Sequence, residues 1–427
     1  MNAIELFEQR KDDPLFNTSY PVRPADWARY RVQDSLSFAE EKELSLYIHI
    51  PFCKRLCSFC EYTRMVCPNE ESQKQYITTV DQDVSNFVSC HPDVVLRGFD
   101  IGGGTPTALT DSNLSLLLQT FREARDWLDV SADFEPSIEA TFDTITERKA
   151  ALIACAGIHR VSLGIQTTDA AVLKENHRNN TNVETMKRTI EMLHRKGIKK
   201  VNLDMMYGLK GQTAETLHRD LQTLYYLNPE QITLYELRTN MIHETAHMSK
   251  KELYDAYTLL FKGLTAMGYH AHFGQNTFSK DSHDMGVSSY LRCRMLEGIA
   301  YKGFGISAQS MSNQGVSYNI GKSSDLLSIN RIISNDCFPE EFTYVLPPEE
   351  LASKYIAIGA YSGSFDLRRL TQILGLDARD YYKGQLDFCL SEGFIEISED
   401  GAYITPKGFE YYGAVFSLFY LPNPYNN

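Results

Sequence analysis

The sequence lacks the features that mark several whole classes of protein. No run of eighteen apolar residues occurs, so no transmembrane helix is predicted. The first residues, MNAIELFEQRKDDPLF, have no basic start followed by an apolar core, so no secretory signal is predicted and we expect a cytoplasmic protein. Cysteine is scarce, with nine in 427 residues. Without an export signal, this odd count at low density favours ligands and buried thiols over disulfides.

Positive charge is also in deficit. Lys and Arg number 42 against 55 Asp and Glu, which gives a formal net charge of −13. A chain this acidic does not bind nucleic acid through its net charge, so no nucleic-acid partner is expected. Hydrophobic residues make up 43% and charged residues 23%, which is ordinary for a globular protein and excludes a disordered or collagen-like chain.

The length of 427 residues predicts two or three domains, or one large barrel with additions, at roughly 100–200 residues per domain. Residues 1–43 are charged and are broken by Pro14, Pro21 and Pro24. We interpret them as an N-terminal arm that precedes the folded core.

From Leu44 onward, short apolar runs alternate with amphipathic stretches. The runs predicted as strands are 44–50, 94–101, 136–140, 159–165, 199–207 and 230–237. Helices are predicted between them, for example at 112–128 and at 182–197, which stops at Gly197. This alternation predicts an α/β fold with a parallel sheet covered by helices. Six units fit an open or partial (β/α)6 barrel better than a closed eightfold one, with ligands at the carboxyl ends of the strands.

A different pattern occupies the end of the chain. Helices are predicted near 347–360, 366–374 and 378–392, and a hairpin follows within 393–408 with Asp400-Gly401 as its turn. Helices followed by a hairpin are typical of a winged helix. We therefore expect the barrel with its extension at 44–320 and a C-terminal domain at 321–427. The helix before the hairpin carries two positive and three negative charges, which favours a lid or docking role over DNA binding.

The strongest chemical signal is a group of three cysteines in the loop after the first predicted strand. Cys53, Cys57 and Cys60 lie within eight residues, so their thiolates can face one inorganic centre. A structural zinc site and an iron–sulfur cube both normally take four ligands. Three cysteines in a cube would leave one iron open for another ligand. The alternatives are three buried thiols, or a zinc knuckle completed by Cys67 or His49.

The other predicted strands also end in glycine or polar residues. Glycines at such an end let backbone amides approach a ligand closely, and a strand-end carboxylate can anchor a polar group. The residues concerned are Gly103, Gly104 and Thr105 after the second strand, Glu139 at the third, Gln166 at the fourth with Arg178 in the following loop, and Asp204 at the fifth.

Taken together, these motifs resemble the radical S-adenosylmethionine superfamily. Their order is YIHIPFCxxxCxFC, GGGTPT, SIEA, RVSLGIQ, HR, NLDMMYGL and GFGISA, between Leu44 and Ala308. Within that superfamily the chain is similar to the oxygen-independent coproporphyrinogen III oxidase family, which includes a haem chaperone branch and class C radical methyltransferases. The resemblance implies a [4Fe–4S] cluster, one or two molecules of S-adenosylmethionine, a 5′-deoxyadenosyl radical, and an electron donor such as flavodoxin or ferredoxin.

The resemblance also implies a role for each matching residue. Cys53, Cys57 and Cys60 would ligate the cluster. The residues expected at the first S-adenosylmethionine are Tyr47 beside the cluster, Phe59 at the adenine, Gly103, Gly104 and Thr105 at the methionine amino end, and Glu139 at a hydroxyl or ammonium group. The residues that match contacts of a second S-adenosylmethionine are Gln166, Arg178 and Asp204.

Departures from the family pattern leave three activities open. The oxidases carry a further cysteine two residues after the third ligand, where this chain has Glu61-Tyr62, and an aliphatic residue where it has Gln309. The haem chaperone motif His-Asn-x-x-Tyr-Trp is missing, because the two tryptophans are Trp27 and Trp127. The activities are a porphyrinogen decarboxylation or other tetrapyrrole transformation, which we favour, radical C-methylation, and haem trafficking without turnover.

One further motif is interpreted as incidental. Residues 243–247 spell H-E-x-x-H, the pattern of zinc proteases. The motif follows a predicted strand end in a polar stretch, rather than lying on a long amphipathic helix, and a third zinc ligand is not evident. We interpret it as a loop over the substrate cavity or as ordinary surface.

Overall fold

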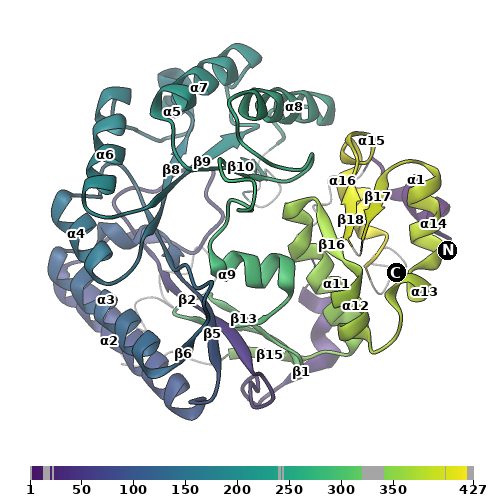
Figure 1. The fold of residues 1–427 in the computed structure, drawn as a ribbon, viewed down its shortest axis with the longest axis horizontal. Coiled ribbons are helices and arrows are strands. Elements are labelled where there is room, and N and C mark those ends of the chain that lie inside the picture. The colour runs from purple at the N-terminus through teal and green to yellow at the C-terminus, as the bar shows by residue number, and fades with distance from the viewer. Residues whose placement is uncertain are drawn as a thin grey trace.

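The computed structural model of the chain describes residues 2–12, 20–21, 24–238, 242, 245–319, 341–399 and 401–420. Figure 1 shows a curved sheet with helices around its outer side, and a smaller group of helices and short strands beside it. Among the described residues, no helix has both the length and the apolar character needed to cross a membrane.

Six parallel strands form the centre of the main sheet. In sheet order they are β2 (Glu43–Ile50), β5 (Val95–Gly103), β7 (Ser137–Ala140), β8 (Arg160–Gln166), β9 (Lys200–Tyr207) and β10 (Gln231–Glu236). They are the six strands that the sequence predicts, and the prediction is confirmed. A seventh parallel strand, β12 (Ala300–Phe304), pairs with the other side of β2 and was not predicted.

The sheet does not close on itself. After β10 it ends at the antiparallel strand β11 (Thr277–Ser279). On the other side, β12 is followed by the antiparallel strands β13 (Gln309–Ser312), β14 (Gly315–Asn319), β15 (Glu341–Val345) and β1 (Arg31–Val32). Because β11 and β1 are the two ends of this order, the sheet is open, and the predicted partial barrel is confirmed.

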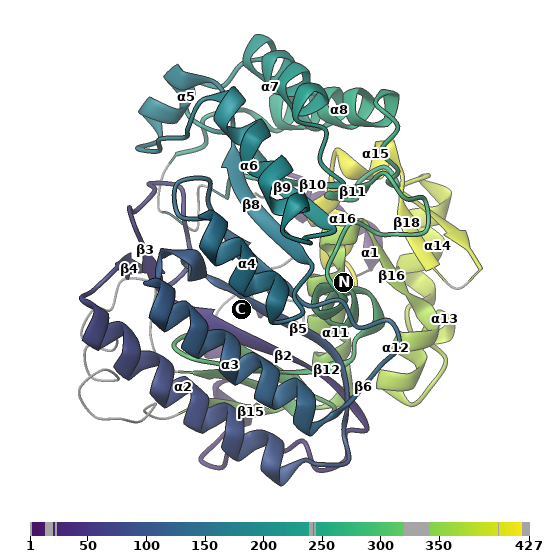
Figure 2. The same cartoon turned by 60° about the vertical axis from the view of Figure 1, so that its left-hand side comes forward.

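Helices between the strands cover the outer face of the sheet (Figure 2). They are α2 (Glu70–Cys90), α3 (Asp111–Trp127), α4 (Glu147–Cys155), α6 (Val183–Arg195), α7 (Ala214–Leu227) and α8 (Lys250–Ala266). Each of them begins at an Asn, Ser or Thr residue whose side chain accepts a hydrogen bond from a backbone N–H of the first turn. These caps fix where each connection ends and each helix starts.

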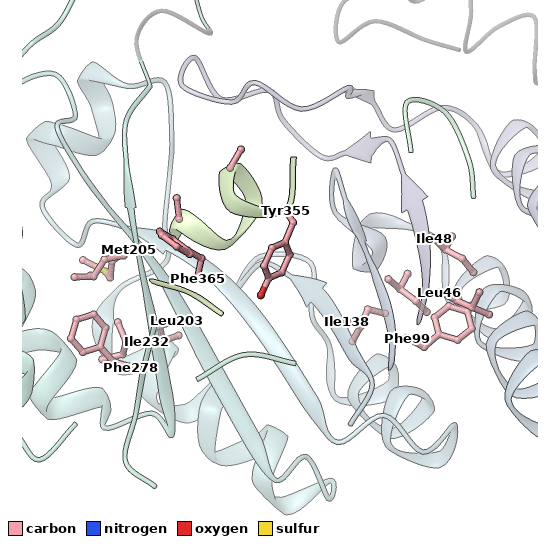
Figure 3. Packing of buried hydrophobic residues seen from close by; sticks show 14 of the residues in the cluster. Leu46, Ile48, Phe99, Ile138, Leu203, Met205, Ile232, Phe278, Tyr355 and Phe365 are labelled. Carbon is pink, nitrogen blue, oxygen red and sulfur yellow. The ribbon is translucent and has the colours of Figure 1, made fainter. Parts of the chain in front are cut away.

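Alternate residues of each strand face the helices and the interior of the barrel. On β2, Leu46 and Ile48 are fully buried in the hydrophobic core, whereas Tyr47 and His49 lie on the opposite face. The packed residues labelled in Figure 3 are Leu46, Ile48, Phe99 and Ile138 on one side and Leu203, Met205, Ile232 and Phe278 on the other, with Tyr355 and Phe365 between them. The interior face is thereby left for polar side chains.

The end of the chain forms the helical part beside the sheet. Its elements are α11 (Pro348–Gly359), β16 (Ser364–Asp366), α12 (Leu367–Leu374), α13 (Ala378–Tyr381), α14 (Lys383–Ser391), β17 (Ile395–Ser398) and β18 (Gly401–Ile404), followed by α15 (Pro406–Phe409) and α16 (Tyr412–Ser417). The three strands pair in the order β16, β18, β17. The single helix predicted at 378–392 is instead two helices, because the backbone turns at the buried residue Tyr382.

Residues that precede the barrel in the sequence pack against this C-terminal part. The helix α1 (Ala3–Arg10) contacts α14 and α16, and the Trp27 Nε1 donates to Glu350 Oε2 at 3.0 Å. Strands β1 and β15 extend the main sheet, so residues of both the expected arm and the expected C-terminal domain contribute to it. The boundaries at 43/44 and 320/321 stay predictions.

Candidate active site

The three-cysteine loop begins where the first strand of the barrel ends. Cys53 lies on β3 (Phe52–Cys53), which pairs with β4 (Met65–Val66) after the loop. The Arg64 guanidinium donates to the carbonyl oxygens of Cys57, at 2.7 Å, and Tyr62, at 3.2 Å. These bonds hold the end of the loop against its middle. Cys53 is buried, and Cys57 and Cys60 are partly buried.

The loop faces a cavity at the carboxyl ends of the parallel strands, with about 1420 Å³ of empty space, part of it open to solvent. Every predicted site residue except Tyr47 lines it, namely Cys53, Cys57, Phe59, Cys60, Gly103, Gly104, Thr105, Glu139, Gln166, Arg178 and Asp204. Tyr47 lies beside these residues, where its ring stacks on Tyr290 at 5.4 Å and its hydroxyl is 3.4 Å from His49 Nδ1. The structure thus brings the set together, and the role of each residue stays a prediction.

The glycine segment at the end of β5 is held in a conformation that other residues rarely adopt. Gly103 has φ +111°, and a Cβ built there would lie 2.5 Å from the His49 ring. Its N–H donates to Glu139 Oε2 at 3.0 Å. Glycine at position 103 therefore allows the close approach of β5, β2 and the Glu139 side chain.

Two carboxyl groups in the cavity have raised pKa values. Burial, followed by the charge of Asp204, raises the pKa of Glu139 to about 8, against the lowering effect of the Gly103 N–H. Burial also raises the pKa of Asp204, although Ser162 Oγ and Asn202 Nδ2 each donate to it at 2.8 Å. A cationic group bound beside Glu139 would favour its ionised form. Glu139 is therefore a candidate to face an ammonium or sulfonium group of a ligand.

Two other residues at the cavity present polar atoms that have no partner. Gln166 Oε1 and Arg178 Nε are buried and make no hydrogen bond. Arg178 donates to Gly164 O at 2.5 Å and approaches Cys57 Sγ at 3.3 Å, and no described carboxylate forms an ion pair with it. Unpaired buried polar groups are costly, so the Arg178 Nε–H suits an anionic group of a ligand, whereas Gln166 Oε1 suits a hydrogen-bond donor such as an ammonium group.

The ligands that a zinc knuckle would need are engaged elsewhere. His49 Nε2 lies 2.9 Å from Thr63 O, and Cys67 Sγ lies 3.6 Å from Ala108 O. Within the described part of the chain, no group of three or more His, Cys, Asp or Glu side chains could hold a single metal ion. Burial raises the pKa of the Cys53 thiol to about 11, so binding at this site would require a cation strong enough to displace the proton. Three separated thiols around a cavity fit a polynuclear cluster better.

Sequence reasoning missed a group of residues at the mouth of the cavity. Glu61 and Arg238 form an ion pair between the cysteine loop and the end of β10. The Arg238 guanidinium lies 6.0 Å from the ring centre of Tyr361, in the C-terminal part. All three line the cavity together with Tyr62 and Tyr235. The only sign of this group in the sequence was Glu61-Tyr62, which stands where the oxidases carry a further cysteine. Of the H-E-x-x-H motif, His243 and Glu244 lie outside the described residues.

An open β/α barrel with three cysteines after its first strand, facing a cavity lined by strand-end polar residues, defines the radical S-adenosylmethionine class of proteins. Residues 47–224 match the model of the Radical SAM superfamily. The chain therefore contains a radical SAM domain, and proteins named heme chaperone HemW and oxygen-independent coproporphyrinogen III oxidase are similar to it. The cofactors of the superfamily are a [4Fe–4S] cluster and S-adenosylmethionine.

Relatives with both names align with most of the chain. Heme chaperone HemW of Bacillus subtilis is 24% identical over 389 residues, which cover 88% of this chain and 98% of that protein. Oxygen-independent coproporphyrinogen III oxidase of Helicobacter pylori is 25% identical over 363 residues, which cover 81% of this chain and 78% of that protein. The structure of coproporphyrinogen III oxidase (HemN) from Escherichia coli has a TM-score of 0.73 at 22% identity and covers 92% of this chain and 95% of that chain, so the two share a fold.

Proposed function

We propose that the protein is a radical S-adenosylmethionine enzyme that transforms a tetrapyrrole, with an activity of the coproporphyrinogen dehydrogenase type or a haem-related one. The observation that carries this proposal is that the three cysteines and the strand-end residues line one cavity. The relatives' names are divided between an oxidase and a chaperone, so they support the family but not one activity.

The residues divide into three groups by what they offer a ligand. Cys53, Cys57 and Cys60 would hold the cluster, and Glu139, with the backbone of Gly103, would bind the polar end of S-adenosylmethionine. When bound, the cluster and S-adenosylmethionine together supply a 5′-deoxyadenosyl radical that removes a hydrogen atom from a substrate carbon. The remaining surface, which includes the aromatic rings at positions 62, 235 and 361, is left for the substrate.

A second candidate function is radical C-methylation with two molecules of S-adenosylmethionine. The partnerless atoms of Gln166 and Arg178, with Asp204 nearby, favour it because they would suit the carboxylate and ammonium groups of a second cofactor molecule. Arginine pairs with a carboxylate in a fixed, two-point geometry. Under either function, an electron donor such as flavodoxin or ferredoxin and a cytoplasmic location remain part of the proposal.

The experiment is anaerobic reconstitution of the full chain with iron and sulfide, followed by reduction and addition of S-adenosylmethionine. Coproporphyrinogen III and haem are then supplied in separate reactions, and the products are identified by mass spectrometry. Loss of carboxyl groups supports the dehydrogenase-like activity, and a gain of methyl mass supports C-methylation. Unchanged tetrapyrroles together with no cleavage of S-adenosylmethionine would contradict an enzymatic function.

A further inference from the structure

Gln166, the last residue of β8, has a backbone conformation that residues with a side chain rarely adopt. Its φ is +58°, in the left-handed region, which costs free energy in any residue other than glycine. The ladder to β9 is also irregular there, because Gly164 pairs with Asp204 and Gln166 pairs with the very next residue of β9. Ile165 is therefore an extra residue, as in a β-bulge, and bulges beside ligand sites re-aim a side chain.

This backbone conformation decides where the Gln166 side chain points. In a regular ladder Gln166 would face the same way as Met205, its partner on β9, which is fully buried in the core. Gln166 instead lines the cavity. A Cβ built on Gly164 would meet Gln166 Nε2 at 3.0 Å and Arg178 Nη2 at 3.3 Å, so both side chains lie over Gly164. The two side chains with partnerless atoms therefore share one part of the cavity.

The turn that follows Gln166 is held by a buried carboxylate on α7. The Thr168 N–H and the Thr168 hydroxyl both donate to Asp220 Oδ1 at 2.6 Å, and the Thr167 hydroxyl donates to Asp220 Oδ2 at 2.8 Å. Asp220 is fully buried, and its helix neighbour Leu221 packs in the hydrophobic core. The turn is thus anchored to a part of the fold that has little freedom to move.

A second side chain holds the backbone around Gln166 from the loop that carries Arg178. Asn180 Nδ2 donates to the carbonyl oxygens of Ile165, at 2.7 Å, and Thr167, at 3.1 Å, the residues on either side of Gln166. A left-handed residue persists only where its surroundings hold it in place, and such residues gather at ligand sites. The backbone at Gln166 meets this condition from two directions, the loop and α7.

The position of Asp220 is explained by the turn that it holds. Burying a carboxylate costs free energy, and an apolar residue at this place on α7 would avoid that cost. Burial raises the pKa of Asp220, and the hydrogen bonds from Thr168 and Thr167 act against this rise. Within the described part of the chain, every hydrogen bond of this carboxylate goes to Thr167 or Thr168. Asp220 is not one of the residues that line the cavity, so it can affect a ligand only through the turn.

We propose that Asp220 is a positioning residue, which holds the turn after β8 so that the Gln166 amide stays directed into the cavity. The Gln166 amide oxygen then accepts from the ammonium group of a second S-adenosylmethionine, while Arg178 pairs with its carboxylate. For the identity of this ligand, the inference rests on the two-cofactor function proposed above. Without the Asp220 carboxylate, the backbone at position 166 relaxes from the left-handed region and the amide loses its direction.

The test measures binding of S-adenosylmethionine by equilibrium dialysis to the anaerobically reconstituted full chain, together with iron and sulfide content. Gln166→Ala should weaken one of two binding events at least about tenfold, because it removes a hydrogen bond to a charged group. Asp220→Ala should weaken the same event by a comparable factor and spare the other event and the cluster. The double variant should bind no more weakly than Gln166→Ala alone, because Asp220 acts through Gln166. Glu215→Gln, at an exposed position on α7, is the matched control and should change nothing.

A second variant covers the case in which Asp220→Ala fails to fold. Thr167→Val keeps the volume of the side chain and removes the hydroxyl that donates to Asp220. It should weaken the same binding event at least about threefold, again with no further loss when combined with Gln166→Ala.

Three results would overturn the proposal. Unaltered binding by the folded variants is one of them. Losses that add to that of Gln166→Ala, or that affect both binding events and the cluster alike, would show a merely structural role. A single binding event in the unaltered chain would overturn the proposal together with the two-cofactor function. The first two results leave that function intact, so the two failures are told apart.

Discussion

Arg178 Nη1 lies 3.3 Å from Cys57 Sγ, although 121 positions separate the two residues in the sequence. The contact joins the loop after β8 to the cysteine loop after β2. It places a permanent positive charge beside one of the three thiols. The same arginine leaves its Nε without a partner, so it links the cysteine loop to the part of the cavity assigned to a second ligand.

The first prediction concerns the cysteine loop. Cys57→Ala should abolish reductive cleavage of S-adenosylmethionine, because two thiolates cannot hold the cluster that the family uses. Cys155→Ala is the matched control, since Cys155 is an exposed thiol at the end of α4. Cleavage is measured as 5′-deoxyadenosine released by the anaerobically reconstituted protein. Full cleavage by Cys57→Ala, or one zinc per chain in place of iron and sulfide, would refute the assignment.

The second prediction concerns the second cofactor molecule. Arg178→Ala should weaken one binding event by on the order of 1.5–3 kcal/mol, because it removes a charge-assisted hydrogen bond to a carboxylate. Equilibrium binding of S-adenosylmethionine to the anaerobic holo-protein measures it. Arg188→Ala, at an exposed position on α6, is the control. A stoichiometry of one per chain that Arg178→Ala leaves unchanged would reject the two-cofactor model and move Arg178 to the substrate.

The third prediction concerns the glycine segment at the end of β5. Gly103→Ala should lower the free energy of unfolding by roughly 1–3 kcal/mol, because alanine is strained at φ +111° and its Cβ would meet the His49 ring. Gly384→Ala is the contrast: a Cβ there meets nothing within 4 Å, and alanine favours the helix α14. Urea unfolding under anaerobic conditions compares the two. Equal stability of Gly103→Ala and the unaltered chain would contradict the strain argument.

The fourth prediction concerns pH. Burial raises the pKa of Glu236 from its ordinary value of 4.5 to about 7, although a hydrogen bond from the Tyr207 hydroxyl at 3.3 Å acts against this. The folded chain therefore holds a proton that the unfolded chain releases near pH 4.5. The stability that the protonated Glu236 side chain contributes to the fold is fully present below pH 4.5. It falls as the pH rises to about 7, and above about pH 7 it no longer changes with pH.

Glu236→Gln should remove this dependence of the unfolding free energy on pH. Between about pH 4.5 and 7, the unaltered chain should lose roughly 2 kcal/mol of unfolding free energy relative to the variant. Urea unfolding of both chains across this range measures the difference. Glu396→Gln, at an exposed position on β17, should follow the unaltered chain. Parallel pH curves for Glu236→Gln and the unaltered chain would show that Glu236 is ionised in the folded state.

The amino-acid sequence determined the six central strands of the barrel and the strand-end residues of its cavity. The carboxyl ends of parallel strands meet at one edge of a sheet, so knowing that β2, β5, β7, β8 and β9 are parallel was enough to bring their terminal residues together. The cysteine loop is local, with its three thiols close in the chain. Strand β12 escaped prediction because AYKGF is short and only partly apolar, and its pairing with β2 joins segments about 250 residues apart.

Tertiary structure alone decided which residues of the C-terminal part line the cavity and which charged residues pair there. Tyr361 reaches the cavity from the C-terminal part, and Arg238 meets Glu61 across 177 positions, with no local pattern to indicate either contact. Trp27 packs with Glu350, at a separation of 323 positions, for the same reason. Gln309 stood in the sequence only as a departure from a family pattern. The fold places its amide oxygen 2.9 Å from Arg294 Nη2, a contact across 15 positions that no local pattern indicated.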